Sequence, residues 1–213
     1  MSRSALNVRF AAEGLDLCIR SLITLRPAEL LAIIASPSLA IAACALLFPD
    51  RSWLVGGLFG LLTMTIAVVD ARFFRIPDLL TAALFTLGLV GGALAAPERI
   101  GEVLGMAVVR AGSYALLFLL FRSTYRMARK REGLGLGDVK LAAAAGAWLD
   151  WFALLGAVEI AATSALLLYL IRGFSTGQPV RMKMRLPFGL FFAPAIFIAW
   201  LLALLQWPLL GGS

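Results

Sequence analysis

Long apolar segments alternate with short polar ones along most of the 213-residue chain. Because the hydrocarbon core of a bilayer needs about 20 helical residues, a segment of 17 or more is long enough to cross it. Backbone polar groups must also be satisfied inside lipid, which favours helices. Six segments reach this length: Leu30–Phe48, Trp53–Val69, Leu79–Ala96, Val103–Phe121, Phe152–Ile171 and Phe188–Trp207.

A seventh apolar segment, Val139–Leu149, holds only 11 residues and follows the glycine-rich sequence GLGLGD. It is too short to cross a bilayer in the usual way. The pattern therefore predicts an all-α polytopic membrane protein with six or seven transmembrane helices and a short helix after the G-x-G-D loop. We expect residues 1–27 to form a cytoplasmic or interfacial arm, and residues 28–213 to form one membrane-embedded domain.

Composition agrees with a membrane protein. The chain is 62% hydrophobic and only 15% charged, whereas soluble domains carry about 25% charged residues. If the N-terminus is cytoplasmic and seven segments cross, sixteen of the nineteen lysines and arginines fall on the cytoplasmic side. This bias predicts a multi-pass protein of the cytoplasmic membrane with a cytoplasmic N-terminus. It also explains the net charge of +7 through contact with anionic lipid, without a nucleic-acid partner.

Histidine is absent, and the two cysteines, Cys18 and Cys44, are far apart. The sequence therefore holds no Ser-His or Cys-His dyad and no H-E-x-x-H zinc motif. Neither a C-x-x-C metal pair nor a disulfide framework is supported. We expect no metal and no cofactor, and carboxylates are the leading candidates for any catalytic groups.

Two aspartates fall at the cytoplasmic ends of apolar segments. Asp70 ends the second segment and Asp138 opens the short fifth one. Carboxylates near hydrocarbon are costly to desolvate, so their placement needs a reason. Asp138 has the simpler alternative of capping the helix after it, and Asp78 that of capping the segment that begins at Leu79. For Asp70 the alternative is a neighbouring arginine that offsets its charge.

A pair of carboxyl groups has a definite chemistry. Two held close together share one proton, so the ionised member activates water while the protonated member donates to a carbonyl oxygen. Asp138 is expected at a helix N-terminus and Asp70 at a helix C-terminus, and the helix dipole favours a carboxylate at the former. We therefore hypothesise that Asp138 is more often ionised and that Asp70 carries the shared proton.

Three motifs then resemble the type IV prepilin peptidases, membrane aspartyl proteases of the G-x-G-D class. They are IPD, GLGDVKLAAAAGAWL and LPFGLFFAPAI, and the resemblance covers about Trp53 to Trp207. It implies that Asp70 and Asp138 are the catalytic pair and that a prepilin or pseudopilin helix is the substrate. Such enzymes cleave the leader peptide at the cytoplasmic membrane face. Residues that match supporting motif positions are Gly135, Gly137, Lys140, Pro77, Asp78, Pro187 and Gly189.

One feature departs from the larger members of that family. They carry paired C-x-x-C motifs linked to N-methylation, and this sequence contains none. We therefore predict a peptidase of the compact form without N-methyltransferase activity. The alternative function is a small ion or solute transporter that uses intramembrane carboxylates. Arg110 and Glu159 lie within apolar segments, and we expect them to form an ion pair, with a role in receiving the substrate helix as the alternative.

Overall fold

The computed structural model describes residues 52–130, 134–176 and 187–210, all built from helices and short connections. The predicted arm at residues 1–27 and the first apolar segment, Leu30–Phe48, lie outside these described residues. Both cysteines also lie outside them, and so do Arg181, Lys183 and Arg185 of the last predicted cytoplasmic loop. The division into an arm and a membrane domain therefore stays a prediction.

The described residues form six α-helices and one 3₁₀ turn, and no strand occurs among them. In chain order they are α3 (Ser52–Phe73), α4 (Asp78–Ala95), η1 (Pro97–Arg99), α5 (Ile100–Arg129), α6 (Leu136–Ala145), α7 (Trp151–Thr176) and α8 (Phe188–Leu210). All but α6 and η1 are long and apolar enough to cross a membrane. The all-α membrane fold predicted from the apolar pattern is confirmed.

The helices overlap the predicted segments, but several of their ends differ by a few residues, and two of the differences have a clear physical reason. The α5 helix continues to Arg129, eight residues beyond the end of its apolar segment. Arginine and lysine are good helix formers, and positive charge is favourable at a helix C-terminus. The apolar pattern therefore stops while the helix continues. The α6 helix begins at Leu136, inside the glycine-rich sequence, and not at Val139.

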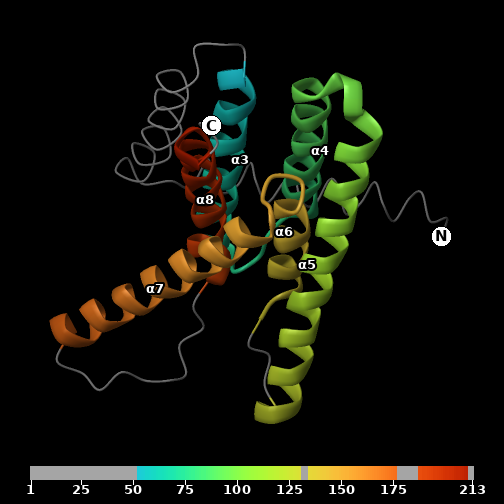
Figure 1. Ribbon diagram of the computed structural model, residues 1–213. Helices are drawn as coiled ribbons and strands as arrows, with labels where there is room; N and C mark the ends of the chain where they lie inside the picture. Colours follow the sequence, from blue (N-terminus) through green and yellow to red (C-terminus); the bar gives the residue numbers. More distant parts are fainter. Residues whose placement is uncertain (1–51, 131–133, 177–186, 211–213) are drawn as a thin grey trace.

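The short α6 helix lies at the centre of the arrangement (Figure 1), where it packs against α4, α5 and α8. The α3 helix packs against α4 and α8, and α8 also packs against α7. Small side chains let α6 approach its neighbours closely, and most of its residues are buried. Just after it, a Cβ on Gly146 would lie 2.4 Å from the backbone nitrogen of Ala111 in α5. The turn therefore requires glycine at this position.

An aromatic cluster closes the bundle beyond the end of α6. The rings of Phe59 and Trp148 stack with centroids 3.8 Å apart, and Trp200 meets Phe59 edge-on at 5.3 Å. The indole N–H of Trp148 donates to the Leu84 carbonyl at 2.9 Å. Beside this cluster, an apolar cavity of about 560 Å³ reaches toward Val55 near the start of α3. The cavity therefore lies toward the opposite end of α3 from Asp70.

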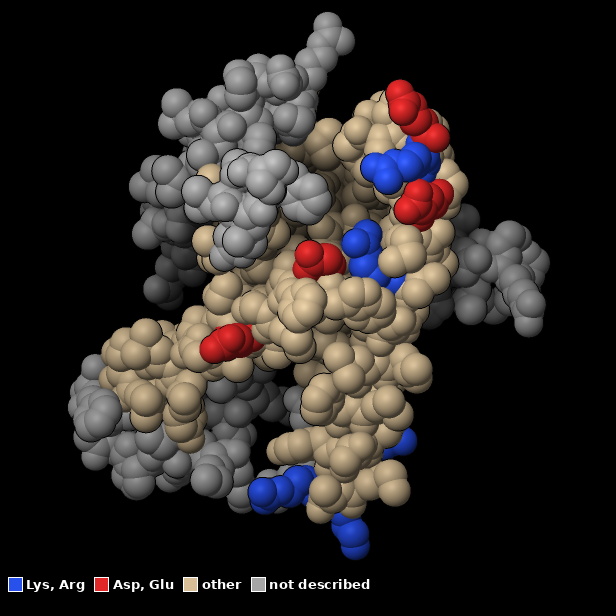
Figure 2. Space-filling model, in the orientation of Figure 1, with Lys and Arg blue, Asp and Glu red and all other residues tan. Residues whose placement is uncertain are grey.

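Charged side chains are sparse on the surface. Figure 2 shows a face that is mostly uncharged, with basic residues gathered where the lower end of α5 extends beyond the other helices. The residues at that end of α5 are Arg122, Arg126, Arg129 and Lys130. A broad apolar surface with charge at one end of a helix fits a protein that spans the inner membrane several times.

Candidate active site

The structure places Asp70 and Asp138 in one buried site, although 68 residues separate them in sequence. Asp70 is 5% exposed and Asp138 is 7% exposed. They are the only buried acidic residues in the described part of the chain. The others there are exposed: Asp78, Glu98, Glu102, Asp150 and Glu159. The pairing of these two carboxyl groups, expected from their positions along the chain, agrees with this arrangement.

Asp138 is held in place by the start of its own helix. It is the third residue of α6, and its Oδ2 accepts the backbone N–H of Gly135 at 2.9 Å. The prediction that Asp138 caps a helix beginning at Val139 is wrong in position: Gly135 is the N-cap, and Asp138, the third residue of the helix, accepts the N–H of that cap residue. The pKa of Asp138 is raised to about 6, mainly by burial and also by the negative charge of Asp70, while the Gly135 N–H and Arg122 act in the opposite direction.

Asp70 is held by a different helix. It lies in the last turn of α3, as predicted, but its Oδ2 accepts the backbone N–H of Leu190 at 3.1 Å. Leu190 is the third residue of α8, so Asp70 also meets the N-terminus of a helix. We expected a helix N-terminus, with its favourable dipole, at Asp138 alone, whereas Asp70 also contacts one, that of α8. Helix ends therefore do not distinguish the two carboxyl groups.

Ile76 joins the three sequence motifs at this site. A Cβ on Gly137 would lie 3.0 Å from the Ile76 Cβ, and one on Gly189 would lie 2.8 Å from the Ile76 Cδ1. The same Cβ on Gly189 would lie 2.8 Å from Asp70 Oδ2. Both glycines therefore make room for a buried isoleucine, and Gly189 also makes room for a carboxylate. This packing role, and not a flexible turn, is what the structure assigns to them.

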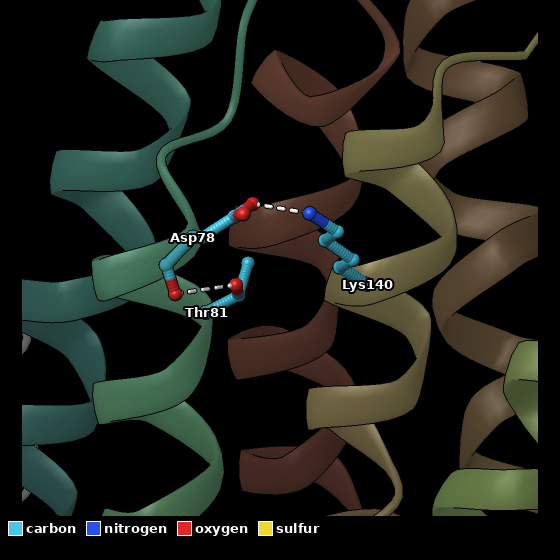
Figure 3. Close-up of polar contacts among 3 residues, drawn as sticks. All are labelled: Asp78, Thr81 and Lys140. Carbon is cyan, nitrogen blue, oxygen red and sulfur yellow. Dashed lines mark hydrogen bonds and ion pairs between the residues drawn. The ribbon is translucent and has the colours of Figure 1, made fainter. Parts of the chain in front are cut away.

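The exposed rim of the site carries an ion pair between two of the supporting residues. Lys140 Nζ lies 2.6 Å from Asp78 Oδ1 (Figure 3), with the side chains 50% and 72% exposed respectively. The expected capping role of Asp78 is wrong: it is the first residue of α4, and its side chain makes no cap hydrogen bond. Exposed pairs of this kind stabilise a fold by less than about 1 kcal/mol. This pair links α4 to α6 two residues beyond Ile76 and Asp138.

The two prolines mark where helices begin. Pro77 precedes α4 with φ of −65°, and its carbonyl accepts the N–H groups of Leu80 and Thr81. Pro187 precedes the first residue of α8. Since proline lacks a donor and has a fixed φ, it suits such a boundary. These prolines set where the helices that flank the aspartates start.

The expected ion pair between Arg110 and Glu159 is wrong. Arg110 Nε is buried without a hydrogen-bond partner, and Glu159 lies exposed on α7. No ion pair joins them among the residues that the structure describes. Their similar depth along two apolar segments suggested the pair, but α5 and α7 meet at the first residue of α7, where Trp151 packs edge-on against Tyr114 with ring centroids 5.3 Å apart, and Glu159 lies about two turns further along α7.

Three site features were missed from sequence alone: Ile76, the Leu190 N–H and Arg122. From the sequence, Arg122 is only one of the sixteen lysines and arginines expected on the cytoplasmic side. Its guanidinium donates to the Leu134 carbonyl at the start of the G-x-G-D sequence. Ile76 belongs to the IPD motif, but Phe73 and Phe74 are also apolar residues between Asp70 and Asp78, so the sequence alone does not single it out. Within the described ranges, no group of three or more potential metal ligands comes together.

The raised pKa of Asp138 predicts a pH dependence of stability. The pKa of Asp138 is about 6 in the folded protein, against 3.8 for an unperturbed aspartate, which we take for the unfolded chain. The protonated carboxyl group therefore stabilises the fold fully below pH 3.8. That contribution, on the order of 3 kcal/mol, is lost as the pH rises through about 6. We expect the unfolding midpoint of the solubilised protein to fall over this range. Asp138→Asn should flatten the dependence, whereas the exposed control Glu102→Gln should not; identical curves for both variants would contradict this assignment.

Comparison with known proteins gives a consistent picture. Residues 57–171 match the type IV leader peptidase family. Leader peptidase HopD of Escherichia coli is 33% identical over 141 residues, which cover 66% of this chain and 88% of that relative. Leader peptidase HopD of Salmonella typhimurium is 36% identical over 140 residues, covering 64% of this chain and 84% of that relative.

Longer relatives also match. The prepilin leader peptidase/N-methyltransferase of Dickeya chrysanthemi is 38% identical over 149 residues, which cover 67% of this chain and 50% of that relative. The match thus spans about half the length of the bifunctional relative. No solved structure matches. The matched residues include Asp70, Asp138 and the helices that carry them, and the chain is a peptidase that belongs to the type IV leader peptidase family.

Proposed function

We propose that this protein is a membrane aspartyl endopeptidase that removes the leader peptide from prepilin-like substrates. Asp70 and Asp138 form the catalytic pair, and water is the nucleophile. The family supports the class of substrate. The observation that carries the proposal is the meeting of the two buried carboxyl groups at the ends of α3 and α6.

Backbone N–H groups orient both carboxyl groups: Leu190 donates to Asp70, with a further contribution from Gly189, and Gly135 donates to Asp138. In the reactive state one group is ionised and the other is protonated. The ionised group takes a proton from water, whose oxygen bonds to the scissile carbonyl carbon while the protonated group donates to the carbonyl oxygen. The C–N bond then breaks as the pair donates a proton to the leaving amine and takes one back from a hydroxyl of the tetrahedral diol, which leaves the product acid and restores one proton to the pair. No covalent enzyme intermediate is formed.

We place this chemistry at the cytoplasmic face, with the N-terminus cytoplasmic. The basic C-terminal end of α5 leads within a few residues to α6, which carries Asp138 near its start. The two features therefore lie on the same side of the membrane. Since basic residues favour the cytoplasmic side, that side is the one from which the pair is reached.

The proposal does not include N-methylation. The bifunctional relatives carry that activity in their names. This sequence has two isolated cysteines and no C-x-x-C pair, so it lacks the paired motifs that the longer family members associate with methylation.

The test is cleavage of prepilins by the purified protein in lipid nanodiscs. A panel from Dickeya chrysanthemi and Escherichia coli serves as substrate, and the Dickeya prepilin leader peptidase/N-methyltransferase is the positive control. We expect a product whose new N-terminus lies at the leader junction and carries no methyl group. Failure to cleave any prepilin that the control cleaves would overturn the proposal. Ion flux through the protein in liposomes would then favour the transporter alternative.

A further inference from the structure

We propose that Arg122 is a positioning residue of this site, which holds the start of the G-x-G-D sequence and through it the orientation of Asp138. This inference rests on the proposed function. The Arg122 guanidinium, on α5, donates to the Leu134 carbonyl. The next residue, Gly135, donates its N–H to Asp138 Oδ2. A continuous chain of contacts thus runs from α5 to the carboxyl group.

The geometry suits arginine in particular. A guanidinium presents several N–H donors in a rigid plane, so it can fix a backbone carbonyl while other donors remain in use. Leu134 is only partly buried, and it begins the described residues that lead into α6. If no donor held the Leu134 carbonyl, the residues before Asp138 would be held mainly by the α6 helix that follows them.

Arg122 also acts on Asp138 by charge. It lowers the pKa of Asp138 and so offsets part of the effect of burial and of Asp70. The other charged groups around Asp138 are few. Asp70 faces it from α3, and Asp78 on α4 pairs with Lys140 of α6 on the exposed rim. The described side chains of α8 include no charged residue.

This role is separate from that of the basic residues further along α5. Arg126, one turn later, is exposed, whereas Arg122 is half-buried and is among the charges that shift the pKa of Asp138. Replacing Arg126 changes the charge of the same helix end by the same amount. Arg126→Gln is therefore the matched control for Arg122→Gln.

Arg122→Gln is expected to move both limbs of the pH profile of kcat/KM for prepilin cleavage to higher pH by at least about half a unit, because a lost positive charge raises both pKa values of a coupled pair. The titration midpoint of Asp138 should move with them. It is measured by infrared spectroscopy of ¹³C-labelled aspartate and assigned with Asp138→Asn. A midpoint and profile that coincide with those of Arg126→Gln would overturn the inference.

Arg122→Lys separates charge from geometry. It should keep the midpoint near that of the unsubstituted protein, yet increase hydrogen exchange of the Gly135 amide about tenfold, since an ammonium group holds the carbonyl less rigidly. This variant also decides the question if Arg122→Gln does not accumulate; unchanged exchange would then overturn the inference. The infrared and exchange readouts need no substrate, so a failure of the proposed function is distinguishable from a failure of this role.

Discussion

Asp70→Asn and Asp138→Asn are each expected to lower the rate of leader cleavage by at least a hundredfold, the lower bound typical of a lost general acid or base. Asparagine keeps the size of the side chain and an oxygen that can accept the N–H of Leu190 or Gly135. The fold should therefore be kept while the shared proton is lost. The measurement is the rate of prepilin cleavage by each variant in membranes with matched protein levels.

Two controls make this result specific. Glu102→Gln removes an exposed acidic group from the first turn of α5 and should cleave at the rate of the unsubstituted protein. The double variant Asp70→Asn/Asp138→Asn should be about as slow as either single one, because residues that act as a unit are not additive. Normal cleavage by a correctly inserted single variant would contradict the catalytic pair.

Gly189→Ala is expected to slow cleavage by about tenfold to a hundredfold, the range that a misplacement approaching 1 Å produces. The new Cβ would lie 2.8 Å from both Asp70 Oδ2 and Ile76 Cδ1. One of these buried groups has to move, and Asp70 is fixed at its other side by its helix.

The matched control is Gly156→Ala in α7, where a Cβ would meet nothing within 4 Å. Alanine in an open helix interior stabilises by roughly 0.5–1 kcal/mol relative to glycine, so this variant should be as active and slightly more stable. Both variants are compared by cleavage rate and by unfolding midpoint. Equal activity of Gly189→Ala and Gly156→Ala would show that the close contact at Asp70 is not needed for function.

Much of the fold followed from the sequence because lipid imposes simple demands. Apolar length predicted each described membrane helix, and α5 exceeded its prediction only where apolar residues gave way to arginines. The two aspartates were also indicated, since a carboxylate beside hydrocarbon needs a partner. Both results depend on position along single helices, which a sequence displays directly.

Contacts between helices were harder to predict from the sequence. The Leu190 N–H reaches Asp70 across 120 residues of chain, and a backbone donor leaves no mark in a sequence. We expected Asp78 to cap its own helix, and instead it pairs with Lys140. Rules for helix caps consider one helix at a time, so they do not include a lysine on another helix. The predicted Arg110–Glu159 pair does not form, since similar depth along two helices does not make two side chains face each other: Glu159 is exposed on α7 and Arg110 Nε is buried.

The wedging of Ile76 between Gly137 and Gly189 has an evolutionary consequence. Three positions from three motifs share one small volume, so none can gain atoms unless another loses them. An alignment of relatives should show covariation: a smaller residue at position 76 should accompany alanine or serine at position 137. Position 189 should vary less than 137, because it also borders the carboxylate of Asp70.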